Sequence, residues 1–515
     1  MPYALRPFLD FSGGLNVDAS PDMLADNELA VADNVDLDER GALNKRGGTV
    51  RLNEELYDVV PTQLFEWVRN DGSARLLTVA DGKLYAVEEG SFLLTELCPV
   101  ADSVISYVNF QDKLYFLDGE KYRYYDGSKV EDVLEDDDET NDLTPIRKCK
   151  LIVWHPMSFR FFAAGNEDDK TALYYSEPNR PGFFKETSRM HPATAEGPIV
   201  ALAVIGSALL VFYKNGAYAW NGHDPESATW SKVPIGQGTT APRTIAHTPS
   251  SLTFMGAGGI YAINPAVAGY NVVITPDEGM VTNLAQNRVA SIINEVLDPA
   301  LCCAVYDARR ECYYLAYQSR NSPGQNDRVL VYNWRLKAFT RYTGLHINDF
   351  CVRSNGDMVA ATLTTDDSGN KRGAIIKLHT GFDDFDGRPV DFRIKTKSHQ
   401  LDYPFFVKKF KNLYLASKYG VGTSGHISVN VNIDSRNQVI DGNILDETGE
   451  FFVWGDIWGK LWGFEEVSVR RAKIRGKGYR IQVEIVNSAQ SQPFALLGVA
   501  VQFKPTRKKG RLLDA

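Results

Sequence analysis

Two stretches of this 515-residue chain have residue types that could bind a ligand, and both lack part of the required pattern. A short acidic run could bind calcium, but it lacks the alternating Asp spacing and the central Gly of an EF-hand loop. A glycine-rich stretch, residues 256–259, leads into the apolar run Ile260-Tyr261-Ala262-Ile263. A phosphate-binding loop is followed by a helix, so this stretch predicts a tight turn between strands instead. The acidic run consists of Glu135, Asp136, Asp137, Asp138 and Glu139.

Nucleophilic and metal-binding residues do not form a known catalytic pattern either. The eight histidines are dispersed, and nothing in the sequence selects a pair of them. The six cysteines form no Cys-x-x-Cys pair and have no histidine at zinc spacing, so we expect buried free thiols. Gly-x-Ser-x-Gly, His-Glu-x-x-His and phosphate-loop motifs are absent from the sequence. We therefore expect a protein without catalysis, cofactor or bound metal.

The strongest organising signal is a repeat of about 45 residues, built from short apolar runs separated by Gly, Asp and Asn. The clearest hairpin is 75–79 followed by 83–87, with Asp81-Gly82 between them, because both residues tolerate positive φ. Units of this length with three or four strands each predict a β-propeller of about seven blades; six or eight blades, or a pair of β-sandwiches, are the alternatives. The units open near Leu64, Ile105, Ile152, Val200, Ile245, Cys302 and Phe350.

The flanking regions differ from the repeats. Residues 1–50 are interrupted by glycines and predict an extended N-terminal arm that could close the propeller ring. Residues 51–387 hold the propeller, with one helix expected near 282–297, where apolar residues follow helical spacing before Pro299. From residue 388 to 505, long alternating strands predict an antiparallel β-sandwich. Residues 506–515 form a basic tail.

Charge divides the chain at the same boundary. Residues 388–515 contain 21 Lys and Arg against 12 Asp and Glu, a net charge of +9. Residues 1–387 contain 35 against 53, a net charge of −18. An acidic body does not retain nucleic acid, whereas the basic end could contact phosphates or an acidic protein surface. We expect partner docking at the basic end, through Lys504, Arg507, Lys508, Lys509 and Arg511.

Three stretches resemble structural proteins from the tail and connector region of tailed phages. The opening carries Phe11-Ser12-Gly13-Gly14-Leu15-Asn16, then Asn34-Val35-Asp36 and Arg40 to Gly48. The match extends loosely to 313–315 and to 331–334 with 337–342, and the C-terminal stretch 476–482 with 493–499 is also similar. Within that class, the chain is most similar to the tail nozzle, also called the tail hub or head-stabilisation protein, of short-tailed phages.

The resemblance implies a structural virion protein without enzymatic activity. Such a subunit forms a hexameric ring below the portal and adaptor, and serves as DNA conduit and gate during packaging and ejection. Its expected partners are further copies of itself, the adaptor or connector protein, tail fibres or other tail proteins, and transiently the viral duplex DNA. The expected location is the virion tail, after assembly in the host cytoplasm. No apolar run approaches the roughly 20 residues that a membrane helix needs, so we expect no membrane contact.

Two alternatives stay open. The chain could be another tail component, such as a distal or minor tail protein, or it could be a carbohydrate-binding or depolymerising propeller. The carbohydrate function predicts paired carboxylates facing each other in the central channel. The conduit function predicts that an acidic surface, with the run 135–139 as its candidate, faces the passing DNA and repels its phosphates.

Overall fold

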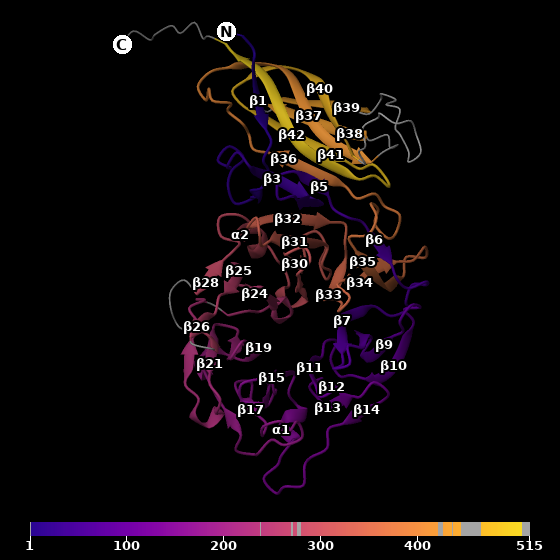
Figure 1. Ribbon diagram of the computed structural model, residues 1–515, viewed down its shortest axis with the longest axis vertical. Coiled ribbons are helices and arrows are strands. Elements are labelled where there is room, and N and C mark those ends of the chain that lie inside the picture. The colour runs from indigo at the N-terminus through magenta and orange to yellow at the C-terminus, as the bar shows by residue number, and fades with distance from the viewer. Residues whose placement is uncertain are drawn as a thin grey trace, which may run out of the picture.

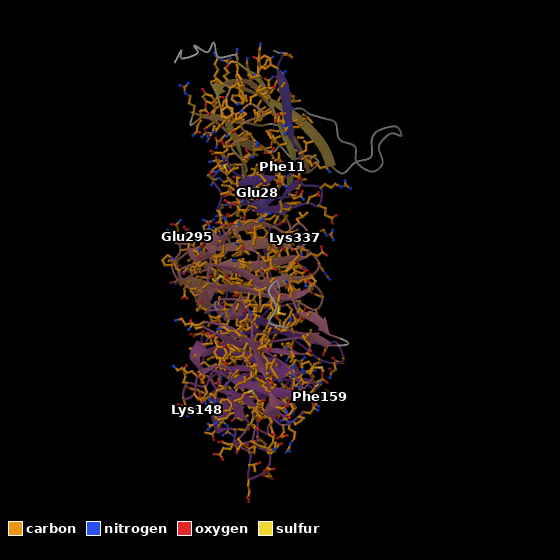
Figure 2. All side chains as sticks on the ribbon, turned by 90° about the vertical axis from the view of Figure 1, so that its left-hand side faces the viewer. Phe11, Glu28, Lys148, Phe159, Glu295 and Lys337 are labelled. Carbon is orange, nitrogen blue, oxygen red and sulfur yellow. The ribbon has the colours of Figure 1, made fainter. Side chains whose placement is uncertain are left out.

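The computed structural model describes residues 2–236, 238–268, 271–274, 280–420, 426–434, 436–443 and 465–506. Nearly all regular structure in them is β-strand. Seven groups of four antiparallel strands, which we call units 1 to 7, follow one another along residues 61–378, except that residues 49–51 supply one strand of unit 7. Each predicted unit opening lies in the first strand of a unit or directly before it. The arrangement is consistent with the blades of a β-propeller, and Figure 1 shows the units following one another around a ring.

Units 1 to 4 are simple meanders, in which each strand pairs with the next. In the first of them Asp81 and Gly82 have φ of 46° and 68°, which confirms the predicted two-residue turn. Unit 1 contains β7 (Pro61–Val68), β8 (Ala74–Ala80), β9 (Lys83–Val87) and β10 (Leu94–Pro99); unit 2 contains β11 (Ser106–Phe110), β12 (Lys113–Leu117), β13 (Tyr122–Tyr125) and β14 (Val130–Asp132); unit 3 contains β15 (Leu151–His155), β16 (Arg160–Ala164), β17 (Leu173–Tyr175) and β18 (Arg189–Met190); unit 4 contains β19 (Ile199–Ile205), β20 (Ala208–Tyr213), β21 (Ala217–Asn221) and β22 (Trp230–Lys232).

Units 5 to 7 depart from this pattern in their outer strands. Unit 5 skips a small hairpin, unit 6 continues into a larger sheet, and unit 7 takes its last strand from the N-terminal segment. Unit 5 contains β23 (Ala246–Thr248), β24 (Ser251–Gly256), β25 (Gly259–Ile263) and β28 (Val281–Asn283), with the hairpin β26 (Ala266–Ala268) and β27 (Asn271–Val273) between the last two; unit 6 contains β29 (Cys303–Asp307), β30 (Cys312–Tyr317), β31 (Arg328–Asn333) and β32 (Ala338–Thr343); unit 7 contains β33 (Ile347–Val352), β34 (Met358–Thr365), β35 (Lys371–Leu378) and β6 (Thr49–Arg51).

Apolar packing holds neighbouring units together. A cluster of buried side chains lies between each successive pair, including units 7 and 1, where Leu64, Leu76, Val359 and Ile375 pack. No single four-stranded unit could bury both of its faces alone, so the units are stable only in contact with their neighbours. The first strands of units 7 and 1, β33 and β7, contact each other directly.

The C-terminal strands form two sheets on a common apolar cluster, above the ring of units in Figure 1. The second sheet is joined to unit 6 through the parallel pairing of Asp33 with Arg341. The first sheet contains β4 (Val35–Leu37), β5 (Leu43–Lys45), β42 (Phe494–Pro505), β37 (Lys408–Gly420) and β40 (Glu465–Gly478), with β1 (Ala4–Phe8) paired to β42; the second contains β3 (Glu28–Asp33), β36 (Phe392–Thr396), β41 (Ile481–Asn487), β38 (His426–Ile433) and β39 (Arg436–Asn443), with β2 (Gly14–Leu15) paired to β3.

The N-terminal segment therefore differs from the predicted arm. Residues 4–45 contribute strands to both C-terminal sheets, and β6 completes unit 7, so a boundary at residue 388 leaves out part of the C-terminal sheets. These strands are short and their partners lie hundreds of residues away, so no local alternation reveals them. The predicted contribution of this segment to ring closure corresponds to β6, which begins inside the predicted arm and pairs with β35 of unit 7.

Helices are few and short in the described residues. The predicted helix over 282–297 is wrong in extent: its first residues belong to β28, and only Ala290–Asn294 is helical. Pairing of β28 with β25 satisfies the backbone there, while Leu284, Ile292 and Val296 still pack against the core. The helical segments are α1 (Thr144–Arg147) and α2 (Ala290–Asn294), with 3-10 turns η1 (Thr194–Glu196), η2 (Pro225–Ser227), η3 (Pro242–Thr244) and η4 (Pro299–Leu301).

Candidate functional site

The acidic run lies on the connection from β14 to α1, at the outer edge of unit 2. Figure 1 shows both elements at the end of the molecule opposite the C-terminal sheets. Glu135 and Asp136 are neutralised by Arg147 at 2.9 Å and Arg180 at 2.6 Å. Asp138 accepts hydrogen bonds from the Thr140 side chain and amide, which lower the pKa of its carboxyl group. Asp137, Asp138 and Glu139 are exposed, and none of the three forms an ion pair with a basic residue in the described structure.

Of the predicted basic docking residues, the structure describes Lys504. It is the penultimate residue of β42, where it lies in the β-ladder directly opposite Lys409 of β37. Arg507, Lys508, Lys509 and Arg511 lie outside the described residues. Sequence reasoning missed that several lysines and arginines of β37 and β40 lie on the same sheet as Lys504, because only the strand register brings them together.

The first strands of the seven units contain three carboxylates, and an arginine engages each of them. Glu66 is bonded to Arg353 at 3.0 Å, Asp307 to Arg310 at 2.7 Å, and Asp349 to Arg243 at 3.1 Å. Each of the three carboxylates is therefore held by a different arginine.

Arg243 reaches across the ring and was not singled out by the sequence. It follows Pro242 in η3, just before the first strand of unit 5, and donates to the carbonyl groups of Thr62 in unit 1 and Asn348 in unit 7. Its partner Asp349 also accepts from the Leu64 amide at 2.9 Å. Burial is the main influence on Asp349 and raises the pKa of its carboxyl group, partly offset by Arg243. The interaction links three units and can fix their relative positions.

The densest buried polar network lies where the N-terminal segment crosses between the units and the C-terminal sheets. Arg46 is 1% exposed and binds both oxygens of Asp384 at 2.9 and 2.8 Å. Its Nε donates to the side-chain oxygen of Asn34 at 2.9 Å, and the same oxygen accepts from the Thr343 amide. The Asn34 amide nitrogen donates to the Asp391 carbonyl at 2.8 Å. The network, which we call the junction, joins the first strands of the chain, unit 6 and the C-terminal sheets.

Glycines allow the close packing at this junction. A Cβ on Gly48 would lie 2.0 Å from the carbonyl oxygen of Asp383, and one on Gly14 would lie 2.5 Å from that of Phe339. Gly14 also has a φ of 64°, which side chains other than glycine rarely adopt.

Potential nucleophiles and metal ligands are buried or separate from one another. All six cysteines are buried, and burial raises the pKa of the thiols of Cys149, Cys302 and Cys351 among others, which disfavours thiolate. Within the described ranges no three His, Cys, Asp or Glu side chains group as metal ligands. The glycine-rich stretch 256–259 is the turn between β24 and β25, as predicted. No described helix has the length and apolarity needed to cross a membrane.

Comparison with known proteins finds only distant structural similarity. No family model matches the chain, and no curated protein matches it. Solved structures that are similar include YCF48 from Cyanidioschyzon merolae, with 10% identity and a TM-score of 0.40, over 64% of this chain and 98% of that one. The extracellular domain of the one-component system BT4673 from B. thetaiotaomicron has 9% identity and a TM-score of 0.43, over 89% of this chain and 63% of that one. An exo-beta-1,3-galactanase from Phanerochaete chrysosporium has 9% identity and a TM-score of 0.24, over 87% and 100%. Such low scores say nothing about activity.

Proposed function

We propose that this chain is a structural virion protein, the tail nozzle or hub subunit of a short-tailed phage. In this proposal it is a seven-bladed β-propeller closed by β6, with a C-terminal β-sandwich to which the N-terminal segment contributes strands. Copies of the subunit form a ring below the portal and adaptor, and the ring guides and gates the DNA.

The observation that carries the proposal is the position of the residues that resemble tail proteins. Asn34, Arg46 and Gly48 belong to that N-terminal resemblance and lie in or beside the junction, and Gly14 of the same resemblance packs against Phe339 of unit 6. The buried Arg46–Asp384 ion pair and close backbone contacts connect the propeller to the sandwich. A motif in this position makes the contact between the two parts of the chain rigid. Such rigidity suits a subunit that must transmit force and hold its place in a ring.

The inner strands support a mechanical function as well. Two of their three carboxylates pair with an arginine from another unit: Glu66 of unit 1 with Arg353 of unit 7, and Asp349 of unit 7 with Arg243, which lies just before unit 5. Side chains committed to holding the ring closed are poorly placed to act as acid and base. This arrangement favours the scaffold over the carbohydrate-processing alternative.

Electron microscopy of the purified protein, and of the virus particles that contain it, tests the proposal. We expect six-fold rings in the purified sample at high concentration, and density for the propeller and sandwich below the adaptor in particles. Density at the distal tip or along a tail tube would instead assign the chain to another tail component. Absence from the particle, together with cleavage of a surface polysaccharide by the purified protein, would overturn the proposal.

A further inference from the structure

The first C-terminal sheet has one basic face that points away from the apolar core. Alternate residues of β40 on this face are exposed, while Ile474 between them is buried. Lys409 of β37 lies directly between Lys477 of β40 and Lys504 of β42 in the strand register. Seven cations belong to the face, which we call the basic face: Lys409, Lys411, Arg471, Lys473, Arg475, Lys477 and Lys504.

These cations lack anionic partners in the described structure. None of the seven forms an ion pair with a described carboxylate, whereas most basic residues of units 1 to 7 do, as Lys83 does with Glu96. Like charges placed directly opposite on neighbouring strands destabilise a sheet, so the row of three lysines costs stability in the free protein. An external anion would remove that cost.

The composition of the face favours a polyanion over a protein partner. Between the cations lie Asn412, Gln502 and Ala500, with Asn412 bonded to Gln502 at 2.6 Å. Tyr414 is paired with Arg471 and Ala500 on the same face, and the exposed Leu5 of β1 lies opposite Gln502. Protein interfaces are usually centred on buried aromatic or aliphatic side chains and are depleted in lysine. Five of the seven cations here are lysines.

We propose that the basic face binds the phosphate backbone of duplex DNA without sequence preference. Successive outward residues of a strand lie about 6.8 Å apart and neighbouring strands about 4.8 Å apart, so the cations form a grid that can follow a line of phosphates. Lysines on a flat sheet cannot reach base edges deep in a groove, so the contact positions the DNA and does not read its sequence. This inference rests on the proposed function, which supplies the DNA. It deepens that function by assigning a surface that can hold the DNA between packaging and ejection.

Fluorescence anisotropy with two unrelated 30-base-pair duplexes, titrated with the full chain at 50 to 200 mM NaCl, tests the inference. If five cations contact phosphates, the slope of log K against log salt is about −4.5, and affinity falls roughly 500-fold over this range. Both duplexes should bind equally. Replacing Lys409, Lys477 and Lys504 together by Gln should reduce the slope by about 2.7. The same variant should unfold no more easily than the parent protein, because it loses only like-charge repulsion.

Matched controls keep the result specific to this face. Gln at the exposed propeller lysines Lys214, Lys337 and Lys371 should leave the slope unchanged. Absence of binding at 50 mM NaCl, an equal loss in the control variant, or binding that depends only on the tail cations from Arg507 to Arg511 would each overturn the inference. So would self-association, measured by sedimentation, that is lost in the triple variant while DNA binding is kept. Six-fold rings at the tail without DNA binding would refute this inference and leave the proposed function standing.

Discussion

Breaking the Arg46–Asp384 pair is the sharpest test of the junction. In Arg46→Met the apolar stem is kept, but both oxygens of Asp384 lose their main donors, because the bonds at 2.9 and 2.8 Å disappear. The side chains are only 1% and 7% exposed, so water cannot replace the guanidinium without opening the structure. Removing one partner of a buried ion pair typically costs about 3–5 kcal/mol. We therefore expect the variant to populate the opened junction about 10² to 10⁴ times more than the parent protein.

Hydrogen exchange is the suitable assay, because a chain of this size need not unfold in one step. Peptides covering residues 43–51 and 390–396 should lose protection, while peptides of units 2 to 4 should keep theirs. The matched control is Arg335→Met, since Arg335 pairs with Glu39 at a site where the side chains are 53% and 69% exposed. An exposed pair contributes about 0–1 kcal/mol. If both variants lose the same protection, or if Arg46→Met changes nothing, the junction does not stabilise the contact between the units and the C-terminal sheets.

Three further predictions concern the ring, the junction and the pH response. Arg243→Met should lower the free energy of unfolding, measured by urea titration, by about 3 kcal/mol, whereas Asp349→Asn should cost less because its amide oxygen still accepts from the Leu64 amide; equal small effects would refute a linking role. Gly48→Ala should cost about 1–3 kcal/mol in thermal unfolding, since the backbone oxygen of Asp383 blocks a Cβ, and more than Gly216→Ala, whose nearest neighbour is a flexible glutamate side chain. Burial lowers the pKa of His399 to about 4. The unfolded chain therefore takes up this proton below about pH 6.5 while the folded chain does not, and stability falls as the pH drops from 6.5 to 4. His399→Gln should remove roughly 2 kcal/mol of the stability difference between pH 7 and pH 5, and an unchanged difference in urea midpoints would contradict it.

Local patterns in the sequence were sufficient to predict the repeating units. The turn at Asp81-Gly82 and the seven unit openings depend on alternation and turn chemistry within a few residues, and such signals do not require knowledge of distant partners. The predicted helix over 282–297 was too long: only Ala290–Asn294 is helical, and Leu284 and Val296 pack against the same core from outside it. Apolar spacing alone does not distinguish a helix from a turn that packs against the same core.

The candidate surfaces were only partly predictable. The excess of positive charge after residue 388 was visible in composition, and Lys504 was named. The grouping of Lys409, Lys477 and Lys504 was not, since it depends on the pairing of three strands that are up to 95 residues apart in the chain. The acidic run was found at once because its members are consecutive, but its place at the outer edge of unit 2 came from the fold.

By itself the sequence determined the all-β character, the repeat and the division of charge, because these depend on residue types and on neighbours a few positions away. The tertiary structure decided that β6 completes unit 7, that Arg46 meets Asp384, and that Arg243 spans three units. Each of these contacts joins residues separated by 100 to more than 300 positions. Such contacts form only when the whole chain has packed, because short segments with no periodic pattern gain their stability from partners that local sequence does not identify.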